Sequence, residues 1–299
     1  MRQITANVFV EDQFSTPPNN RGCNPGFVTT SEGIVMIDTP MLPTDAVKWR
    51  DDIAQRGEVR FIINTHHHID HTTGNYFFPG AVVSHELVKE MLAAPLASVA
   101  ASERAKEAAK ANLGQVDYVR LLIKELDPEG LPLLDEHYQF KSPTITFSER
   151  LTLYVGEHTF ELIYLPGHTL GHIGVYIPQE KVFFAGDNFT SASQPSMANC
   201  LPLEWVESLK KIEAMDIDVV VPGHGEVCDR REVREFRLFI EKCIAIVREA
   251  IKQGMSIEEA ADKISFEELY PGKNRGVAVH PGPETQRSNV LRLYKRLSR

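Results

Sequence analysis

The sequence has few cysteines, no surplus of basic residues and no long apolar run, and each shortage excludes a class of protein. The four cysteines lie far apart without a C-x-x-C pair, which argues against a disulfide framework or a thiolate zinc site. They are Cys23, Cys200, Cys228 and Cys243. The formal net charge of −9 argues against a nucleic-acid-binding protein, because such a protein needs a basic face to contact phosphates.

Neither a signal peptide nor a membrane span is predicted. The first ten residues, MRQITANVFV, contain no apolar core of signal-peptide length. No run reaches the roughly 18 apolar residues that a membrane span needs. We therefore expect no membrane partner, and the scarce cysteines favour the reducing cytoplasm as the location. Apolar residues make up 42% of the 299 residues, which is enough for a buried core in one large domain, alone or with an appendage.

Short apolar segments alternate with helices and turns through residues 1–229. We predict strands at 3–10, 27–30, 34–37, 59–63, 81–83, 144–147, 151–155, 160–165, 173–177, 182–185 and 218–221. Helices are predicted from Thr44, as the capping residue, to Arg56, and from about Leu203 to Met215. This order predicts an α/β protein in which two mixed β-sheets pack together with helices outside.

Two segments are mostly helical. Residues 86–141 form an insertion in which no strand is predicted, and two interpretations of it stay open: it covers a pocket, or it is a helical layer with only a structural role. Residues 230–299 form a C-terminal helical extension. Within the extension, a long apolar helical face ends at Gly254, and Ser256 and Glu259 form a capping-box pattern that opens a short helix. A last helix is predicted at 284–297.

The stretch Thr65–Asn75 follows the predicted strand at 59–63 and contains the pattern H-x-H-x-D-H. Its potential metal ligands are His66, His68, Asp70 and His71. A strand that ends here and turns sharply would direct several of these side chains at one point. In an extended segment His67 would point away from its neighbours, so we do not expect it to be a ligand.

Three later apolar strands each end in a potential ligand that follows a glycine. These ligands are His168, Asp187 and His224. Glycine lets the backbone turn where a larger residue would clash, and strand ends commonly carry the chemistry of sheet-based folds. No such context surrounds His85, His137 or His158.

The seven candidates comprise five imidazoles and two carboxylates, a set that suits zinc, iron or manganese better than calcium or magnesium. Seven ligands exceed the four of one tetrahedral zinc ion. They fit two ions roughly 3.5–4 Å apart that share one carboxylate. We therefore predict a centre of two divalent metal ions, with zinc as the first choice and iron or manganese as alternatives.

The motifs THHHIDH, LPGHTLGH, FFAGD and VPGHG resemble, in order and spacing, those of the metallo-β-lactamase-fold superfamily of metal-dependent hydrolases. The seven-ligand pattern is similar to that of glyoxalase II and its relatives. The resemblance covers about residues 3–228 and implies an αββα sandwich with the metals in a groove at one edge of the two sheets. We accordingly expect a metallo-β-lactamase-like domain at 1–229, followed by the helical extension at 230–299.

The resemblance also implies a role for each ligand. His66, His68 and His168 would hold the first metal, Asp70, His71 and His224 the second, and Asp187 would bridge them. The chain has Asp187 where the zinc β-lactamases carry cysteine, and it lacks the basic and aromatic segment that glyoxalase II carries after the bridging aspartate. His172 matches a histidine often present in this subgroup, and its role stays open between support of a ligand and packing.

These residues predict hydrolysis by a hydroxide that bridges two metals. Asp70 would orient this nucleophile and shuttle a proton. The expected substrate is a small carbonyl compound: an ester, a lactone, a thioester or an amide such as a β-lactam. The alternatives are a mononuclear iron oxidoreductase of the same fold, similar to a persulfide dioxygenase, and a phosphodiesterase. The fold does not determine the substrate.

The walls of the substrate pocket are expected to come from the insertion at 86–141 and from residues 190–201. The C-terminal extension contains the motif Val279-His280-Pro281-Gly282-Pro283 between two predicted helices. Three roles stay open for His280: a contact with the pocket, a contact in a homodimer, or a place in a plain connector.

Overall fold

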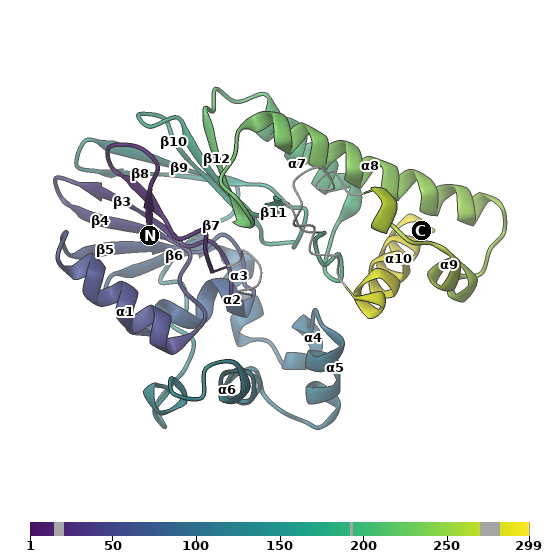
Figure 1. Ribbon diagram of the computed structural model, residues 1–299, viewed down its shortest axis with the longest axis horizontal. Coiled ribbons are helices and arrows are strands. Elements are labelled where there is room, and N and C mark those ends of the chain that lie inside the picture. Colours follow the sequence, from purple (N-terminus) through teal and green to yellow (C-terminus); the bar gives the residue numbers. More distant parts are fainter. Residues whose placement is uncertain (15–20, 192–193, 270–281, 299) are drawn as a thin grey trace.

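The computed structural model describes residues 1–14, 21–191, 194–269 and 282–298. Two β-sheets pack face to face, and helices cover their outer faces (Figure 1). This arrangement confirms the predicted α/β sandwich of two mixed sheets flanked by helices. No helix within the described ranges is long and apolar enough to cross a membrane.

The first sheet has seven strands in sequence order: β1 (Arg2–Gln3), β2 (Val8–Val10), β3 (Gly26–Thr30), β4 (Gly33–Ile37), β5 (Val59–Ile63), β6 (Ala81–His85) and β7 (Ile145–Phe147). Strands β1 to β4 pair antiparallel and include the predicted hairpin, whereas β4 to β7 pair parallel. Because parallel strands end at the same edge, the segments that follow β4 and β5 leave the sheet side by side. The histidine-rich stretch begins at this edge.

The second sheet contains β8 (Arg150–Val155), β9 (His158–Tyr164), β10 (Ile173–Ile177), β11 (Val182–Thr190) and β12 (Val219–His224), in the order β12-β11-β10-β9-β8. Only the β11–β12 pair is parallel among these neighbours. In β9 the side chains of Phe160 and Leu162 alternate with more exposed ones and enter the core between the sheets, together with Val35 and Ile63 of the first sheet. This apolar layer fixes the sheets so that their strand ends meet at one edge.

Helix α1 (Pro43–Ala54) covers the outer face of the first sheet through side chains such as Trp49. The prediction that Thr44 caps this helix is wrong. The N-cap residue is Leu42, and its side chain makes no capping hydrogen bond. Instead, the carboxylate of Asp127 accepts hydrogen bonds from the backbone N–H and the hydroxyl of Thr44, at 2.9 and 3.0 Å. The cap comes from the insertion, 83 residues further along the chain.

The insertion at 86–141 contains α3 (Glu86–Ala93), α4 (Leu96–Val99), α5 (Glu103–Lys110) and α6 (Gln115–Leu126) and no strand, as predicted. The side-chain amide of Gln115 donates to the carbonyls of Met91, Leu92 and Ala94 at 2.9, 3.2 and 2.7 Å. These bonds fix the start of α6 against the end of α3 and the turn that leads into α4.

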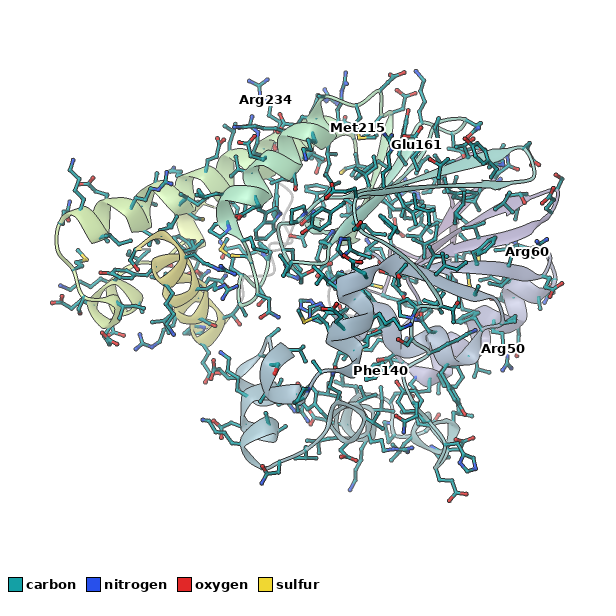
Figure 2. All side chains as sticks on the ribbon, turned by 180° about the vertical axis from the view of Figure 1, so that it is seen from behind. Arg50, Arg60, Phe140, Glu161, Met215 and Arg234 are labelled. Atoms are coloured by element: carbon teal, nitrogen blue, oxygen red, sulfur yellow. The ribbon has the colours of Figure 1, made fainter. Side chains whose placement is uncertain are left out.

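The C-terminal extension forms α8 (Arg230–Lys252), α9 (Ile257–Lys263) and α10 (Pro283–Leu297). The predicted capping box is present, since Ser256 Oγ accepts from the N–H of Glu259 and the Glu259 carboxylate accepts from the N–H of Ser256. Buried side chains of α8 share one core with α7 (Pro202–Glu213) on the outer face of the second sheet. Seen from behind, Arg50 on α1 and Arg234 on α8 project from opposite helical layers (Figure 2).

Candidate metal centre

The structure gathers all seven predicted ligands at one edge of the sandwich. They form two groups that share Asp187, and within each group the potential ligand atoms all lie within 4.8 Å of one another. Site 1 comprises His66, His68, His168 and Asp187, and site 2 comprises Asp70, His71, His224 and Asp187. The division is the one that the resemblance implies, and the ligand roles themselves stay a prediction.

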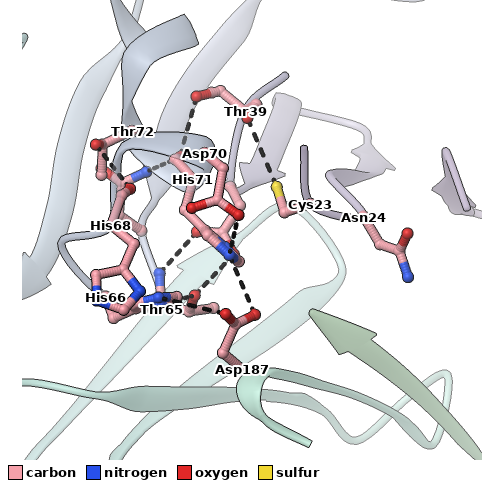
Figure 3. A network of polar contacts seen from close by, with 12 residues as sticks. Cys23, Asn24, Thr39, Thr65, His66, His68, Asp70, His71, Thr72 and Asp187 are labelled. Atoms are coloured by element: carbon pink, nitrogen blue, oxygen red, sulfur yellow. Dashed lines mark hydrogen bonds and ion pairs between the residues drawn. The ribbon is translucent and has the colours of Figure 1, made fainter. Parts of the chain in front are cut away.

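The loop after β5 supplies ligands to both sites because it turns at once into a short helix, α2 (Ile69–Thr72). His68 is the extended N-cap of α2, so the chain direction changes between the site 1 ligands and the site 2 ligands. Two side chains hold the turn: Asn64 donates to the carbonyl of His71 at 3.1 Å, and Thr72 donates to that of His68 at 3.0 Å. The loop residues and Asp187 of β11 lie together in this network (Figure 3).

Two of the predicted strand-end glycines are required by the close approach of the strands. Gly186 has φ +48°, and a Cβ there would lie 2.6 Å from the hydroxyl of Thr65. A Cβ on Gly223 would collide with the carboxylate of Asp187. Glycine at both positions therefore lets β11 and β12 bring Asp187 and His224 against the loop after β5.

Asp187 presents one carboxylate oxygen to each site. Its Oδ2 lies 3.8 Å from Nε2 of His66 and 3.5 Å from Nε2 of His168. Its Oδ1 lies 3.2 Å from Nε2 of His71 and 3.4 Å from Nε2 of His224. This is the geometry expected of a carboxylate shared by two ions.

The spacing and the hydrogen bonding of these atoms fit two metal ions. Metal–ligand distances of about 2.0–2.2 Å place the ligand atoms of a tetrahedral zinc roughly 3.3–3.6 Å apart. The neighbouring ligand atoms within the two sites lie 3.1–3.8 Å apart. Nε2 of His66, Nε2 of His71 and Oδ1 of Asp187 are buried without a hydrogen bond, which a bound cation would compensate.

The imidazoles of site 1 are in the protonation state that binds metals. Burial lowers the pKa of His66 and His68 well below the ordinary value, and it also lowers that of His168. These rings are therefore neutral near pH 7. A neutral imidazole offers a free nitrogen lone pair, so site 1 needs no loss of protons before it accepts an ion.

The groups of site 2 form charged pairs. Burial disfavours the charged form of Asp187, but the facing His224 and His71 hold its pKa well below the usual range, and the same two histidines lower that of Asp70. In return, and against the effect of burial, the two carboxylates raise the pKa of His224 to about 10. Burial opposes the charged form of His71 too, but the carboxylates of Asp187, Asp38 and Asp70 contribute to a pKa well above the ordinary value.

Sequence reasoning missed the role of Asp38, which follows β4 with φ 55°. Its carboxylate accepts from the backbone N–H and the hydroxyl of Thr65 at 2.8 and 2.7 Å, and it lies 2.8 Å from Nδ1 of His71. This contact leaves Nε2 of His71 facing Asp187 and site 2. A carboxylate directly after a strand is the same signal that identified Asp187, and it could have indicated Asp38.

His172 and Cys23 lie next to the ligands. The ring of His172 stacks on that of His66 at 5.0 Å, and its Nε2 accepts the backbone N–H of Asn188, the residue after Asp187. His172 thus packs on one ligand and holds the strand that carries another. Cys23 forms a third cluster with Asp38 and His71, but burial raises the pKa of its thiol to about 12, so it stays protonated and contacts the carbonyl of Thr39.

The remaining histidines are outside the metal groups of the described residues. His67 is buried, lines the pocket described below and belongs to neither site. His85, His137 and His158 are likewise absent from both groups. His280 lies outside the described residues.

A pocket of about 690 Å³ borders five of the seven candidate ligands: His68, Asp70, His168, Asp187 and His224. Both segments that were expected to form its walls contribute. The insertion supplies Leu96, residues 99–105, Gln115 and Tyr118, and the other segment supplies Thr190 at the end of β11 and Gln194, Pro195 and Ser196 after it. The start of α10 adds Glu284, Thr285 and Ser288, a contribution that the sequence did not indicate. In Figure 1, α4 and α5 face α10 across this region.

The fold and the paired ligand groups define the class to which the chain belongs. A model of the Metallo-beta-lactamase superfamily matches residues 18–224. The chain therefore belongs to that superfamily.

Among curated relatives, the 2,4-dinitroanisole O-demethylase subunit alpha of Nocardioides sp. is 27% identical over 79% of this chain and 63% of that protein. A hydroxyacylglutathione hydrolase of Mesorhizobium japonicum is 27% identical over 52% of this chain and 43% of its own length. The chain thus spans about half the length of these curated relatives. The solved metallo-beta-lactamase family protein TTHA1429 of Thermus thermophilus has a TM-score of 0.63 and 16% identity, over 98% of this chain and 94% of that one, which shows the shared fold.

Proposed function

We propose that the protein is a hydrolase with two divalent metal ions, most suitably zinc, that acts on a small carbonyl substrate. The observation that carries this proposal is the position of Asp187, whose two oxygens face two separate sets of imidazoles. A carboxylate that lies between two sets of histidines is better suited to bind two metal ions than a single ion. The pocket beside it gives a small substrate access to both sites.

Metal ions at the two sites would supply an activated water near neutral pH and a Lewis acid for the substrate oxygen. The chain's own residues determine where these act. Asp70 borders the pocket, and its Oδ2 lies 3.1 Å from Nε2 of His224. A carboxylate in this position can orient an attacking water and accept its proton. The buried histidines of site 1 would hold the ion on the other side of Asp187 in place.

The distribution of charged side chains in the pocket favours a carbonyl substrate over a polyanionic one. Among the described pocket residues outside the two sites, the acidic and basic side chains are Glu103, Arg104 and Glu284, so away from the metal centre a polyanionic substrate would meet more carboxylates than cations. A phosphodiester of a nucleic acid would require the reverse balance. A relative named as a hydroxyacylglutathione hydrolase agrees with a hydrolytic reaction.

The experiment that tests the proposal couples metal quantification with a panel of substrates. We expect two zinc ions per chain and metal-dependent turnover of at least one ester, lactone, thioester or β-lactam. One iron per chain with oxygen uptake would instead establish an oxidoreductase. Preferential cleavage of a phosphodiester or a sulfate ester would replace the carbonyl substrate. As a control, exposed Asp52→Asn should change neither metal content nor turnover.

A further inference from the structure

The pocket wall formed by Leu96 and residues 99–105, together with Gln115 and Tyr118, has polar side chains that are hydrogen-bonded within the protein. The hydroxyl of Ser102 accepts the N–H of Ala105 at 3.1 Å and lies 3.3 Å from the hydroxyl of Tyr118. The side-chain amide of Gln115 donates to three backbone carbonyls. These bonds engage the polar side chains of the wall before any substrate arrives.

The charged residues of the same wall are also paired. Glu103 contacts Lys106 at 2.5 Å, and Arg104 contacts Glu125 at 2.7 Å. Arg104 is the one lysine or arginine side chain among the described residues that line the pocket, and Glu284 contributes a carboxylate from the opposite side. A substrate with its own carboxylate would therefore lose hydration without gaining a dedicated cation.

The surface that remains is apolar. Leu96, Val99, Ala100, Ala101 and Ala105 all line the pocket. The wall is fixed beside the candidate metal centre, because the amide of Asn199 lies 3.4 Å both from the carbonyl of Val99 and from Nε2 of His68. A substrate whose reacting group lies at the two sites would place its remaining atoms against this wall.

We infer that the substrate is a neutral ester or lactone whose unreactive part is an apolar chain or ring that binds between α4–α5 and the start of α10. This inference rests on the proposed hydrolase function and adds the chemistry of the group that confers specificity. A pocket of about 690 Å³ has room for such a group, since pockets of about 300–1,000 Å³ hold drug-sized ligands.

The first test measures kcat/KM for p-nitrophenyl esters with acyl chains of increasing length on the metal-loaded protein. Each methylene that the wall buries should raise kcat/KM about fourfold, and the adipate monoester should react at least about tenfold more slowly than the hexanoate ester of equal length. Rates that do not change with chain length, or a preference for the adipate ester, would overturn the inference.

The second test changes the wall itself. Ala100→Trp fills the pocket, so the loss of kcat/KM should grow with acyl length and reach about tenfold for the hexanoate ester. Ala97→Trp is the matched control, because Ala97 lies on the same helix but is exposed and outside the lining. Ala100→Lys should reduce the difference in kcat/KM between the adipate and hexanoate esters, because the lysine gives the terminal carboxylate a cation. Equal losses in the Ala97 and Ala100 tryptophan variants would contradict the assignment.

A binding measurement separates this inference from the proposed function. Calorimetry on the metal-loaded protein should show tighter binding of octanamide than of suberamic acid, which has the same length and a terminal carboxylate. If octanamide binds more tightly but no ester is cleaved, the hydrolase proposal fails and the pocket preference stands. If esters are cleaved but neither the affinity nor the rate is higher for the compound without the terminal carboxylate, the hydrolase proposal stands and the inference fails.

Discussion

Site 1 and site 2 share Asp187 but differ in burial and in charge. The side chains of His66 and His168 in site 1 are 0% and 3% exposed, whereas those of Asp70 and His224 in site 2 are 23% and 22% exposed. Burial keeps the site 1 imidazoles neutral, while the carboxylates of site 2 raise the pKa of their histidine neighbours. Site 1 is thus the more buried of the two, although His68 and His168 border the pocket, and site 2 is the more exposed and holds protons that an ion must displace.

We expect this difference to give the two sites different roles. A more buried site with neutral imidazoles suits an ion that stays bound, and a more exposed site suits the ion that contacts substrate. The order in which the ions are lost, the effect of removing one ligand from each site and the pH dependence of metal affinity each test this difference.

The largest effect is expected for Asp187→Asn, which removes the carboxylate that both sites share. Metal content should fall by at least one ion per chain, and turnover should fall on the order of a thousandfold or more. Mass spectrometry of the bound metals and steady-state kinetics measure these losses. Full metal content together with full turnover would show that Asp187 does not bridge.

The next effect separates the sites by removing one histidine from each. His168→Ala and His224→Ala should each keep one ion per chain, with turnover reduced by on the order of a hundredfold. Because site 1 is more buried, the ion left in the His224 variant should withstand a chelator longer than the ion left in the His168 variant. The reverse order of loss would contradict the assigned difference in burial.

A smaller effect is expected for Asp38→Asn, which weakens the contact that orients His71 without removing a ligand. Substitutions of this kind cost about 10–100-fold in metal affinity. Zinc competition with a chromophoric chelator should show this loss at site 2 while the affinity of site 1 stays within about twofold. Equal weakening of the two sites would mean that Asp38 supports the loop as a whole.

The smallest effect is the pH dependence of zinc affinity. His71 and His224 have raised pKa values, the latter about 10, so at pH 7 both are protonated without metal and an ion must displace their protons. The affinity of site 2 should therefore rise with pH, by about tenfold per pH unit for each proton displaced. Site 1 imidazoles are neutral already, so its affinity should stay nearly constant between pH 6.5 and 8. Calorimetric zinc titrations at both values check this, and parallel changes at the two sites would refute it.

Much of the site was predictable because its signals are local. The H-x-H-x-D-H pattern and the glycines before His168, Asp187 and His224 each depend on a few consecutive residues. The capping box of Ser256 and Glu259 was predicted for the same reason and is present. The family model and the two mixed sheets confirm the family and the fold that these motifs indicated.

The features that sequence reasoning missed depend on contacts between distant segments. The start of α1 is capped by Asp127, which lies 83 residues beyond Thr44, and not by the side chain of Thr44 as predicted. Asp38 and His71 meet because parallel β4 and β5 end at the same edge. His67 belongs to neither metal group, in line with the prediction that it is not a ligand, but its burial at the pocket was not predicted.

The kinds of ligand, their positions at strand ends and the class of fold follow from local sequence patterns, because alternation, turns and ligand spacing are properties of short segments. Tertiary packing was needed to show which oxygen of Asp187 faces which site, and that α10 forms a pocket wall opposite Leu96 and residues 99–105. The physical reason is that packing of the sheets and helices brings together residues such as Ala101 and Ser288, which no local pattern relates. The same packing buries His66 and His168 of site 1 more deeply than Asp70 and His224 of site 2.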